Sequence, residues 1–433
     1  MAEPILPDFD YFAKEPTMHS IDTSTTERVG PFNDTIQAKT AITFNIAASE
    51  LYTALHNTTL HVQFQVRDTD GTADLNGATT CSLKNLALHS MWNKLEVYLN
   101  GNLAETVTDY PYRAYFQTLT EFDEDVLKTR GALMGWSKDT TGHMEAMHKQ
   151  DNNLGAKERN KNVASSPTVT MIGKLFSDII NQGRSIPPNT RISIVLTPSA
   201  SGFVVGGEDG EDSAIVIKKA FLMVERQRVS KQLALLHSQM FTKRPARLYT
   251  RKIRIAKNQI EANLTEKTFQ SLFNAPSDIT TLPDRFVVAF VDNASVTGAY
   301  NKNPFNFKPA ALSSIEAKHG DRVLAKYDCT WATLGGYSHV YYALLKEFGA
   351  DDEFNHTINV TPDEFKAGYC LFPFRVVPRG LQGAVLGPPA SGNISLEVKF
   401  ATAPTAPLSV IVFAEYRGYY DVLPTAAPGV QAN

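Results

Sequence analysis

Apolar and polar residues alternate along most of this chain in short runs, which is the pattern of half-buried β-strands. The clearest run is 60–66, in which Leu60, Val62, Phe64 and Val66 fall on one face. Other strands are predicted in the first half of the chain over residues 36–46, 83–89, 95–99, 168–172, 191–196 and 214–224. In the second half, strands are predicted over residues 248–255, 285–292, 369–377, 393–400 and 409–416, and a hairpin over residues 315–323.

Three stretches replace this alternation with helical spacing. Residues 112–122 and 337–348 carry aromatic and leucine side chains at that spacing, and residues 231–241 form a short segment with an apolar side. The aromatic residues of the first two stretches could be interpreted as a ligand-binding box, but such residues far more often form a core or a subunit interface. We expect the second role for Tyr110, Tyr112, Tyr115, Phe116, Tyr341 and Tyr342.

One pattern occurs twice. Tyr115, Leu119, Glu121 and Phe122 return with the same spacing as Tyr341, Leu345, Glu347 and Phe348. Each copy follows a strand and turn, and each is followed by two apolar runs. This shared order suggests a strand-rich domain that is present twice, each copy with a helix-bearing insert, and so predicts two β-sandwiches. Duplicated β domains usually build structures rather than catalyse reactions.

The length of 433 residues suits two domains of about 200 residues each. We predict an N-terminal arm over residues 1–34, a first sandwich over 35–228, a linker helix over 229–246, a second sandwich over 247–424 and a tail over 425–433. Residues 137–166 are expected to form a long polar loop, and loops of that length are uncommon unless they are functional. Residues 206–212 are expected to form an acidic, exposed loop.

The formal net charge of −3 argues against a protein that coats nucleic acid, which requires an excess of Lys and Arg. One local exception is the stretch 243–257, whose basic residues are Lys243, Arg244, Arg247, Arg251, Lys252, Arg254 and Lys257. It could face nucleic acid or an acidic neighbour. The competing interpretation, which we favour, is a solvated strand face, because Ile253 and Ile255 alternate with Arg254.

The three cysteines, Cys81, Cys329 and Cys370, are too few and too widely spaced for a disulfide framework or a CxxC metal site. They fit a reducing compartment. The first residues lack the pattern of a signal peptide, and no apolar run approaches the roughly 18 residues of a membrane helix. We therefore expect a protein that is neither secreted nor embedded in a membrane.

The sequence holds no phosphate-binding loop, no dinucleotide-binding glycine motif and no His-Glu-x-x-His zinc motif. His143 and His148 are five positions apart and do not share a helix face. The run 68–71 opens like a calcium loop but lacks the glutamate at position twelve, so a turn is expected. The acidic run 351–353 is expected to be a solvated loop, and Cys370 a buried, inert thiol. We predict no catalytic, cofactor-binding or metal-binding residue.

Several longer motifs resemble one family. Residues 110–115, Tyr-Pro-Tyr-Arg-Ala-Tyr, follow a Leu-Asn-Gly hairpin, and residues 138–144 and 291–308 carry further matching strings. Together with the closing strands at 393–400 and 410–416, they resemble the major capsid proteins of Polinton (Maverick) elements and adintoviruses. The string Asn-Pro-Phe-Asn-Phe-Lys at 303–308 is the most specific of these matches. The resemblance extends from about residue 21 to residue 423.

The resemblance implies a fold and a role. The fold is all-β, with two consecutive jelly-roll β-sandwiches and short helices in the inserts between strands, related to the adenovirus hexon. Three subunits would form a pseudo-hexagonal capsomer that tiles an icosahedral shell, with penton or minor capsid proteins as further partners. The protein would reside in the virion after assembly inside the host cell. Residues 243–257 are the candidate contact with packaged DNA. The family has no catalytic residues to assign here.

Two other functions compete with this one. Jelly rolls also serve carbohydrate-binding and adhesive proteins, which usually are secreted. An enzyme of the cupin or glycosidase type would require a histidine-rich metal set or a carboxylate pair on inward-facing strands. The absence of a signal peptide argues against the first, and no such residues stand out in the sequence for the second.

Overall fold

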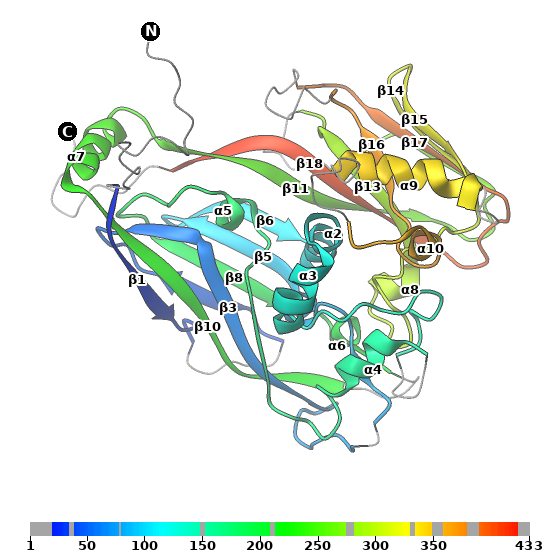
Figure 1. The fold of residues 1–433 in the computed structure, drawn as a ribbon, viewed down its shortest axis with the longest axis horizontal. Helices are drawn as coiled ribbons and strands as arrows, with labels where there is room; N and C mark the ends of the chain where they lie inside the picture. The colour runs from blue at the N-terminus through cyan, green and yellow to red at the C-terminus, as the bar shows by residue number, and fades with distance from the viewer. Residues whose placement is uncertain are drawn as a thin grey trace, which may run out of the picture.

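The computed structural model describes residues 20–33, 39–77, 79–147, 152–207, 213–273, 281–329, 334–348, 358–378 and 389–422. Eight strands of the first half form two antiparallel four-stranded sheets, in the orders β1-β10-β3-β7 and β2-β8-β5-β6 (Figure 1). These strands are β1 (Ile21–Val29), β2 (Ile42–Ile46), β3 (Tyr52–Asp68), β5 (Trp92–Leu99), β6 (Asn102–Thr108), β7 (Val169–Gly173), β8 (Ile192–Pro198) and β10 (Ser213–Val229).

The second half has the same construction. Its two antiparallel sheets have the orders β11-β18-β13-β16 and β12-β17-β14-β15. The strands are β11 (Ala246–Ile260), β12 (Glu266–Phe269), β13 (Arg285–Asp292), β14 (Leu312–His319), β15 (Arg322–Asp328), β16 (Phe372–Arg375), β17 (Ile394–Phe400) and β18 (Leu408–Val422).

Counted within its own half, each set of eight strands gives the sheet orders 1-8-3-6 and 2-7-4-5. An eight-stranded double sheet with this interleaved order is a jelly roll. The predicted all-β double jelly-roll fold is therefore confirmed. One short additional pair, β4 (Ser82–Leu83) with β9 (Val205–Gly206), lies outside this scheme in the first half.

The repeated sequence pattern occupies equivalent places in the two barrels. Helix α2 (Tyr110–Glu121) lies between strands five and six of the first barrel, and α9 (Leu334–Phe348) lies between strands five and six of the second. The remaining helical segments are α1 (Ala87–Ser90), α3 (Glu124–Val126), a π-helical turn (Leu127–Gly131), α4 (Leu154–Asn160), α5 (Asp178–Asn181), α6 (Ser201–Val204), α7 (Lys231–Phe241), α8 (Asn293–Val296) and α10 (Pro362–Lys366).

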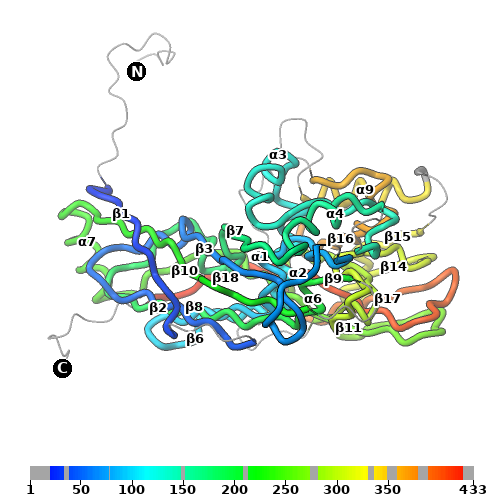
Figure 2. Tube along the Cα trace, turned by 90° about the horizontal axis from the view of Figure 1, so that it is seen from below, coloured from blue at the N-terminus to red at the C-terminus, as the bar shows by residue number. Residues whose placement is uncertain are grey.

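Local sequence explains the main strands. In β3 the alternating residues identified from the pattern, Leu60 to Val66, are buried, and in β13 nearly every residue is buried because the strand lies between β16 and β18. Asn100 and Gly101 have positive φ angles of 52° and 85°, as a tight hairpin between β5 and β6 requires. The two barrels lie side by side, and α7 joins them at one end (Figures 1 and 2).

Two predicted segments differ from the structure. Residues 83–89, expected as a strand, form only the end of β4 and then α1, because Leu86 adopts a left-handed φ of 56°. Every residue there is buried, so the sequence shows no alternation that distinguishes helix from strand. The expected arm, 1–34, includes β1, whose mostly exposed and polar residues conceal an edge strand that pairs with β10. Residues 1–19 lie outside the described residues.

The polar segment 137–166 is also not simply a loop. It contains α4, and it buries Asp139, Met144, Asn153 and Arg159. Of the expected acidic loop, residues 208–212 lie outside the described residues, and so does the tail 425–433. Every named sheet draws its strands from one half of the chain. The domain boundaries proposed above stay a prediction.

Candidate functional site

An extensive set of buried polar contacts lies where the two barrels meet. We call this region the inter-barrel seam. It consists of Lys84, Glu105, α2, residues 136–147 and 152–160 and Asp178 from the first half, and β11, residues 299–308, residues 358–370 and β18 from the second. Figure 1 shows α2 between the two groups of strands. Because the seam fixes how the two barrels sit against each other, we treat it as the candidate functional site.

Aromatic packing forms the apolar part of the seam. Helix α2 carries Pro111 in its first turn, a favoured position, and its residues from Tyr110 to Thr120 are all buried. The Tyr115 ring stacks on Phe305, with 4.1 Å between centroids, and Phe116 stacks on Phe307 at 5.1 Å. The expectation that α2 aromatics form core is thus confirmed. In α9, Tyr341 is half-buried and Tyr342 is 58% exposed, so for these two residues the alternative of a subunit interface stays a prediction.

The string at 303–308 owes its residue types to this packing. Phe305 and Phe307 supply the rings of the second half that stack on α2. Asn303, from the same string, is fully buried. Its side-chain Nδ2 donates to the Asp139 carboxylate at 3.2 Å and to the Met144 carbonyl at 2.9 Å. The most specific motif of the resemblance is therefore a contact between barrels.

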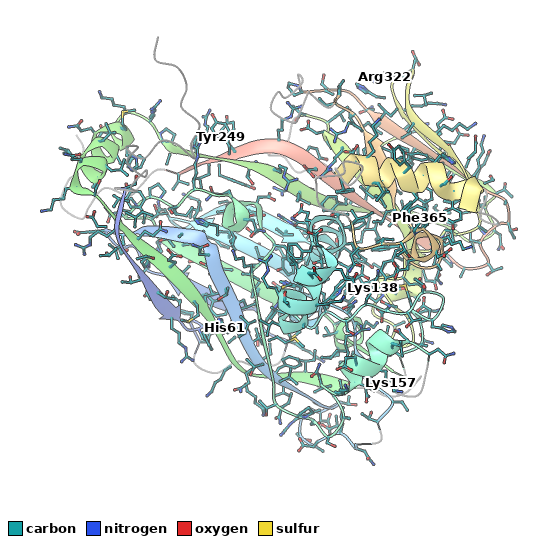
Figure 3. The ribbon with its side chains drawn as sticks, in the orientation of Figure 1. His61, Lys138, Lys157, Tyr249, Arg322 and Phe365 are labelled. Carbon is teal, nitrogen blue, oxygen red and sulfur yellow. The ribbon has the colours of Figure 1, made fainter. Side chains whose placement is uncertain are left out.

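The segment 137–166 supplies the polar partners of that motif. Arg159 pairs with Asp139 at 2.5 Å and donates through Nε to the Leu83 carbonyl at 2.7 Å. Lys138 pairs with Glu364 of α10 at 2.7 Å and also donates to the Asn359 carbonyl at 2.8 Å. Figure 3 shows Lys138 on the side of the first half that faces α10, where Phe365 is labelled. The long polar segment thus tethers one barrel to the other.

Lys84 is a buried cation that joins the barrels through backbone carbonyls. Its Nζ donates to Gly202 of the first half at 2.5 Å, and to Ala299 and Lys302 of the second half at 3.0 and 2.6 Å. Burial lowers the pKa of Lys84 to about 7, and the nearby Glu145 carboxylate opposes this shift. Three acceptors for three ammonium protons satisfy the charged form. Lys84 was not among the residues predicted from the sequence, although a lysine within the predicted strand 83–89 was a visible signal.

A cluster of buried charges forms a second tie. Arg113 of α2 pairs with Glu105 at 3.0 Å and with Asp178 at 2.7 Å. Asp178 in turn accepts from three groups of the second barrel: the Ile253 N–H at 3.1 Å, Arg254 at 2.7 Å and the Tyr420 hydroxyl at 3.1 Å.

The two carboxyl groups of this cluster respond oppositely to their surroundings. Burial, joined by the neighbouring Asp178 charge, raises the pKa of Glu105. Burial would also raise the pKa of Asp178, but the Arg113 and Arg254 guanidinium groups outweigh it and hold that pKa below its ordinary value. Asp178 is therefore the ionised centre on which the two barrels converge.

The two copies of the repeated glutamate are connected by one series of alternating charges. Arg251 contacts Glu121 at 3.4 Å and Glu415 at 3.3 Å. Arg285 then pairs with Glu415 at 2.7 Å and contacts Glu347 at 3.6 Å. Burial opposes ionisation of Glu415, but Arg285 and Arg251 overcome it and lower its pKa. The glutamate of each helix insert thus contributes to the same network.

The basic stretch 243–257 takes part in these ties instead of forming a purely solvated face. Arg247 pairs with Asp421 at 2.9 Å and Lys257 with Asp109 at 2.6 Å, in addition to the Arg251 and Arg254 contacts above. The Lys252 ammonium lies 4.5 Å from the centre of the Tyr420 ring. The favoured sequence interpretation was therefore incomplete, because alternation along a strand cannot show which acidic residues of the other barrel will face it.

The residues considered for chemistry behave as structural groups. Asp68 accepts the N–H groups of Thr72 and Ala73 at 2.8 and 3.0 Å, which confirms the turn. Cys370 is fully buried, and burial raises the pKa of its thiol, as expected for an inert residue. His148 and residues 351–353 lie outside the described residues. Within the described ranges, no group of three or more His, Cys, Asp or Glu side chains is placed to hold a metal ion.

His89, at the edge of the seam, should make stability depend on pH. Its ring is fully buried against Tyr110 and Phe176, with Nδ1 2.8 Å from the Tyr110 hydroxyl oxygen, and burial lowers its pKa to about 3. An unfolded histidine titrates near 6.5, so the folded state binds fewer protons below that pH. Burial of the neutral His89 ring therefore contributes its full stability above pH 6.5, and this stability is lost as the pH falls toward 3.

Between pH 7.5 and 5.0 we expect His89 to cost the fold about 2 kcal/mol of unfolding free energy. Urea unfolding at both pH values should show this loss in the natural protein and a loss smaller by that amount in His89→Gln, whose side chain does not titrate. Equal losses in the two proteins would contradict the assignment.

No family model and no curated protein matches this sequence. Among solved structures, a chain of the Sputnik virophage aligns at 10% identity with a TM-score of 0.64, covering 100% of this chain and 94% of the other. The mavirus major capsid protein aligns at 14% identity and a TM-score of 0.55, covering 99% of this chain and 96% of the mavirus chain. The Faustovirus major capsid protein aligns at 9% identity and a TM-score of 0.57, covering 97% of this chain and 93% of the Faustovirus chain.

The alignments extend over nearly the full length of both partners, so the likeness includes both barrels and the region between them. At these identities it concerns the fold. The chain has the double jelly-roll fold of these viral capsid proteins from one end of its described residues to the other.

Proposed function

We propose that this chain is the major capsid protein of a double-stranded DNA virus or of a virus-like Polinton element. The observation that carries the proposal is the pair of barrels with identical strand order, held side by side by a buried seam. A subunit of this kind presents two similar sides to its neighbours. Three subunits around an axis then give six similar barrels, a pseudo-hexagon that can tile a shell.

The equivalence of α2 and α9 indicates how the ring would close. In the first barrel, α2 packs against the second barrel of the same subunit. In the second barrel, α9 occupies the same connection, yet Tyr342 on it is 58% exposed. In a ring of alternating barrels, α9 would face the first barrel of the next subunit. We therefore assign the exposed face of α9 to the trimer contact.

Purified protein should be a trimer in mass photometry, with about three times the chain mass of 47.7 kDa, and should form hexagonal particles or shells in negative stain. Such an interface should exceed about 2,000 Å². Tyr342→Asp should convert trimers to monomers with unchanged circular dichroism, whereas Tyr342→Phe should leave trimers intact. A stable monomer of the natural protein at micromolar concentration would count against the capsomer.

The same proposal places the protein in the capsid shell, assembled inside the host cell, with itself, penton proteins and minor capsid proteins as partners. No helix in the described ranges is long and apolar enough to cross a membrane. The contact with packaged DNA through residues 243–257 has less support, since Arg247, Arg251, Arg254 and Lys257 pair with acidic groups of the chain itself.

A further inference from the structure

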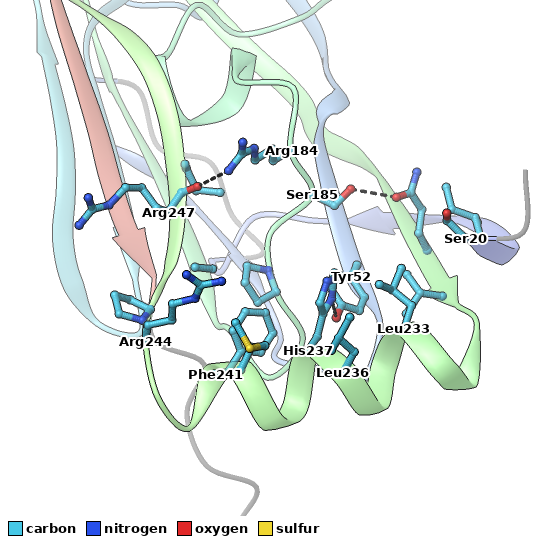
Figure 4. A pocket seen from close by; sticks show the side chains of 18 of the residues that line it. Ser20, Tyr52, Arg184, Ser185, Leu233, Leu236, His237, Phe241, Arg244 and Arg247 are labelled. Carbon is cyan, nitrogen blue, oxygen red and sulfur yellow. Dashed lines mark hydrogen bonds between the residues drawn. The ribbon is translucent and has the colours of Figure 1, made fainter. Parts of the chain in front are cut away.

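A groove of about 930 Å³ lies between α7 and the beginning of β11 (Figure 4). We call it the α7 groove. Its apolar wall comes from α7 and consists of Leu233, Leu236, Met240 and Phe241. None of the residues of α7 is buried, and the Leu236 side chain is 54% exposed. The apolar side of this helix therefore lies open above a hollow instead of packing on a barrel.

The groove is a fixed feature of the fold and not a detached linker. His237 of α7 is hydrogen-bonded through Nδ1 to the Tyr52 hydroxyl of β3 at 2.7 Å. Ser230 caps the beginning of the helix by accepting the Leu233 N–H. On the opposite side, Arg184 donates to the Arg247 carbonyl at 2.8 Å, as Figure 4 shows. These contacts connect the helix to the first barrel and the far wall to the second.

Both ends of the described chain reach this groove. Ser20 and Ile21, the first described residues, are part of its lining. At the other end, Val422 closes β18 opposite Ala246, which also lines the groove. The described residues thus end beside the groove at both Ser20 and Val422, so a segment of the chain itself needs no long path to cover it.

The composition of the two terminal segments, residues 1–19 and 423–433, distinguishes between them. Within residues 1–19, the stretch 5–12 contains five large apolar side chains, Ile5, Leu6, Phe9, Tyr11 and Phe12. Residues 1–19 also contain more acidic than basic residues, namely Glu3, Asp8, Asp10 and Glu15 against Lys14. The groove offers the complement, an apolar wall together with Arg184 and Arg244. Residues 423–433 have neither acidic nor aromatic residues.

We propose that residues 1–19 of the same chain fold back over the α7 groove. Their apolar side chains pack on Leu233, Leu236 and Phe241, and their carboxylates face Arg184 and Arg244. At about 3.3 Å per extended residue, ten residues span roughly 33 Å, which is ample to cross such a groove. The interaction covers the apolar side of α7, the helix that joins the barrels. It does not depend on whether the protein forms a capsid.

Hydrogen exchange on the full-length chain tests this directly. Amides of residues 3–16 should exchange at least about tenfold more slowly in the natural protein than in Leu236→Asp. Leu235→Asp is the matched control, because Leu235 is 62% exposed on the same helix but does not line the groove. In that variant the protection should remain. Unprotected residues 3–16 in the natural protein, or equal losses in both variants, would overturn the proposal.

A disulfide identifies the occupant. The native cysteines are all buried, so cysteines introduced by Phe9→Cys and Leu236→Cys should be the ones that react under mild copper-phenanthroline oxidation. The oxidised protein should run as a monomer on a non-reducing denaturing gel, and a tryptic peptide pair joining positions 9 and 236 should appear. Cross-linked dimers, or protection found in residues 423–433 instead, would assign the groove to another occupant and refute the proposal.

Discussion

Replacing Arg113 by methionine should lower the free energy of unfolding by about 3–5 kcal/mol. Methionine keeps most of the side-chain length but leaves Glu105 and Asp178 as two buried carboxyl groups without their shared cation. Both are almost fully buried, so water cannot replace the lost contacts. Urea unfolding followed by the fluorescence of the buried Trp92 measures the loss.

The matched control is Arg247→Met, the same substitution at an exposed ion pair. Arg247 and Asp421 have side chains that are 43% and 35% exposed, and pairs of this kind contribute less than about 1 kcal/mol. If the two variants were destabilised equally, the cluster around Asp178 would not be the tie between barrels that its geometry indicates.

Phe305→Ala should be nearly as damaging, with an expected loss of about 3–5 kcal/mol. The ring is fully buried, stacks on Tyr115 and meets Tyr112 edge to face at 6.0 Å. Truncation leaves a cavity between two barrels that other seam contacts hold in place, so the walls cannot collapse freely. Thermal and urea unfolding of the variant should both report the loss.

Phe32→Ala provides the comparison for this prediction, because Phe32 is 71% exposed and should change stability by less than about 0.5 kcal/mol. A second observation is informative for Phe305→Ala. If the seam is the weak point, hydrogen exchange should increase on both α2 and residues 299–308, which belong to different barrels. An increase limited to one barrel would contradict a shared seam.

The seam also explains how the two copies of the duplicated unit have diverged. Tyr115 of the first copy is fully buried against the second barrel, whereas the matching Tyr341 is half-buried and donates to the Val360 carbonyl of its own barrel at 2.7 Å. The first copy carries the longer insert, residues 109–168, which provides Asp139 and Arg159. The first insert thus serves contacts between the barrels, while the second makes such contacts through residues 358–370 and leaves Tyr342 of α9 exposed.

Much of the fold was determined by local pattern. The alternation of residues 60–66, the Asn100-Gly101 turn and the helical spacing of 112–122 and 337–348 each act over neighbouring positions, so the sequence alone indicates the strands, the hairpin and the helices. The repeat also showed that the halves are related. Where local pattern misled, at 83–89 and at β1, uniform burial or uniform exposure removed the periodicity that distinguishes strand, helix and arm.

Local patterns could not predict the contacts of the seam. Lys84, Asp139 and Asp178 are separated in sequence by tens to hundreds of residues from the groups that they bind in the second barrel. Their partners are chosen by how the barrels pack, and the energy of a buried charge depends on the whole of its surroundings. The sequence by itself determined two related β-barrels, but only the tertiary structure decided that a polar segment and a basic strand bind them together.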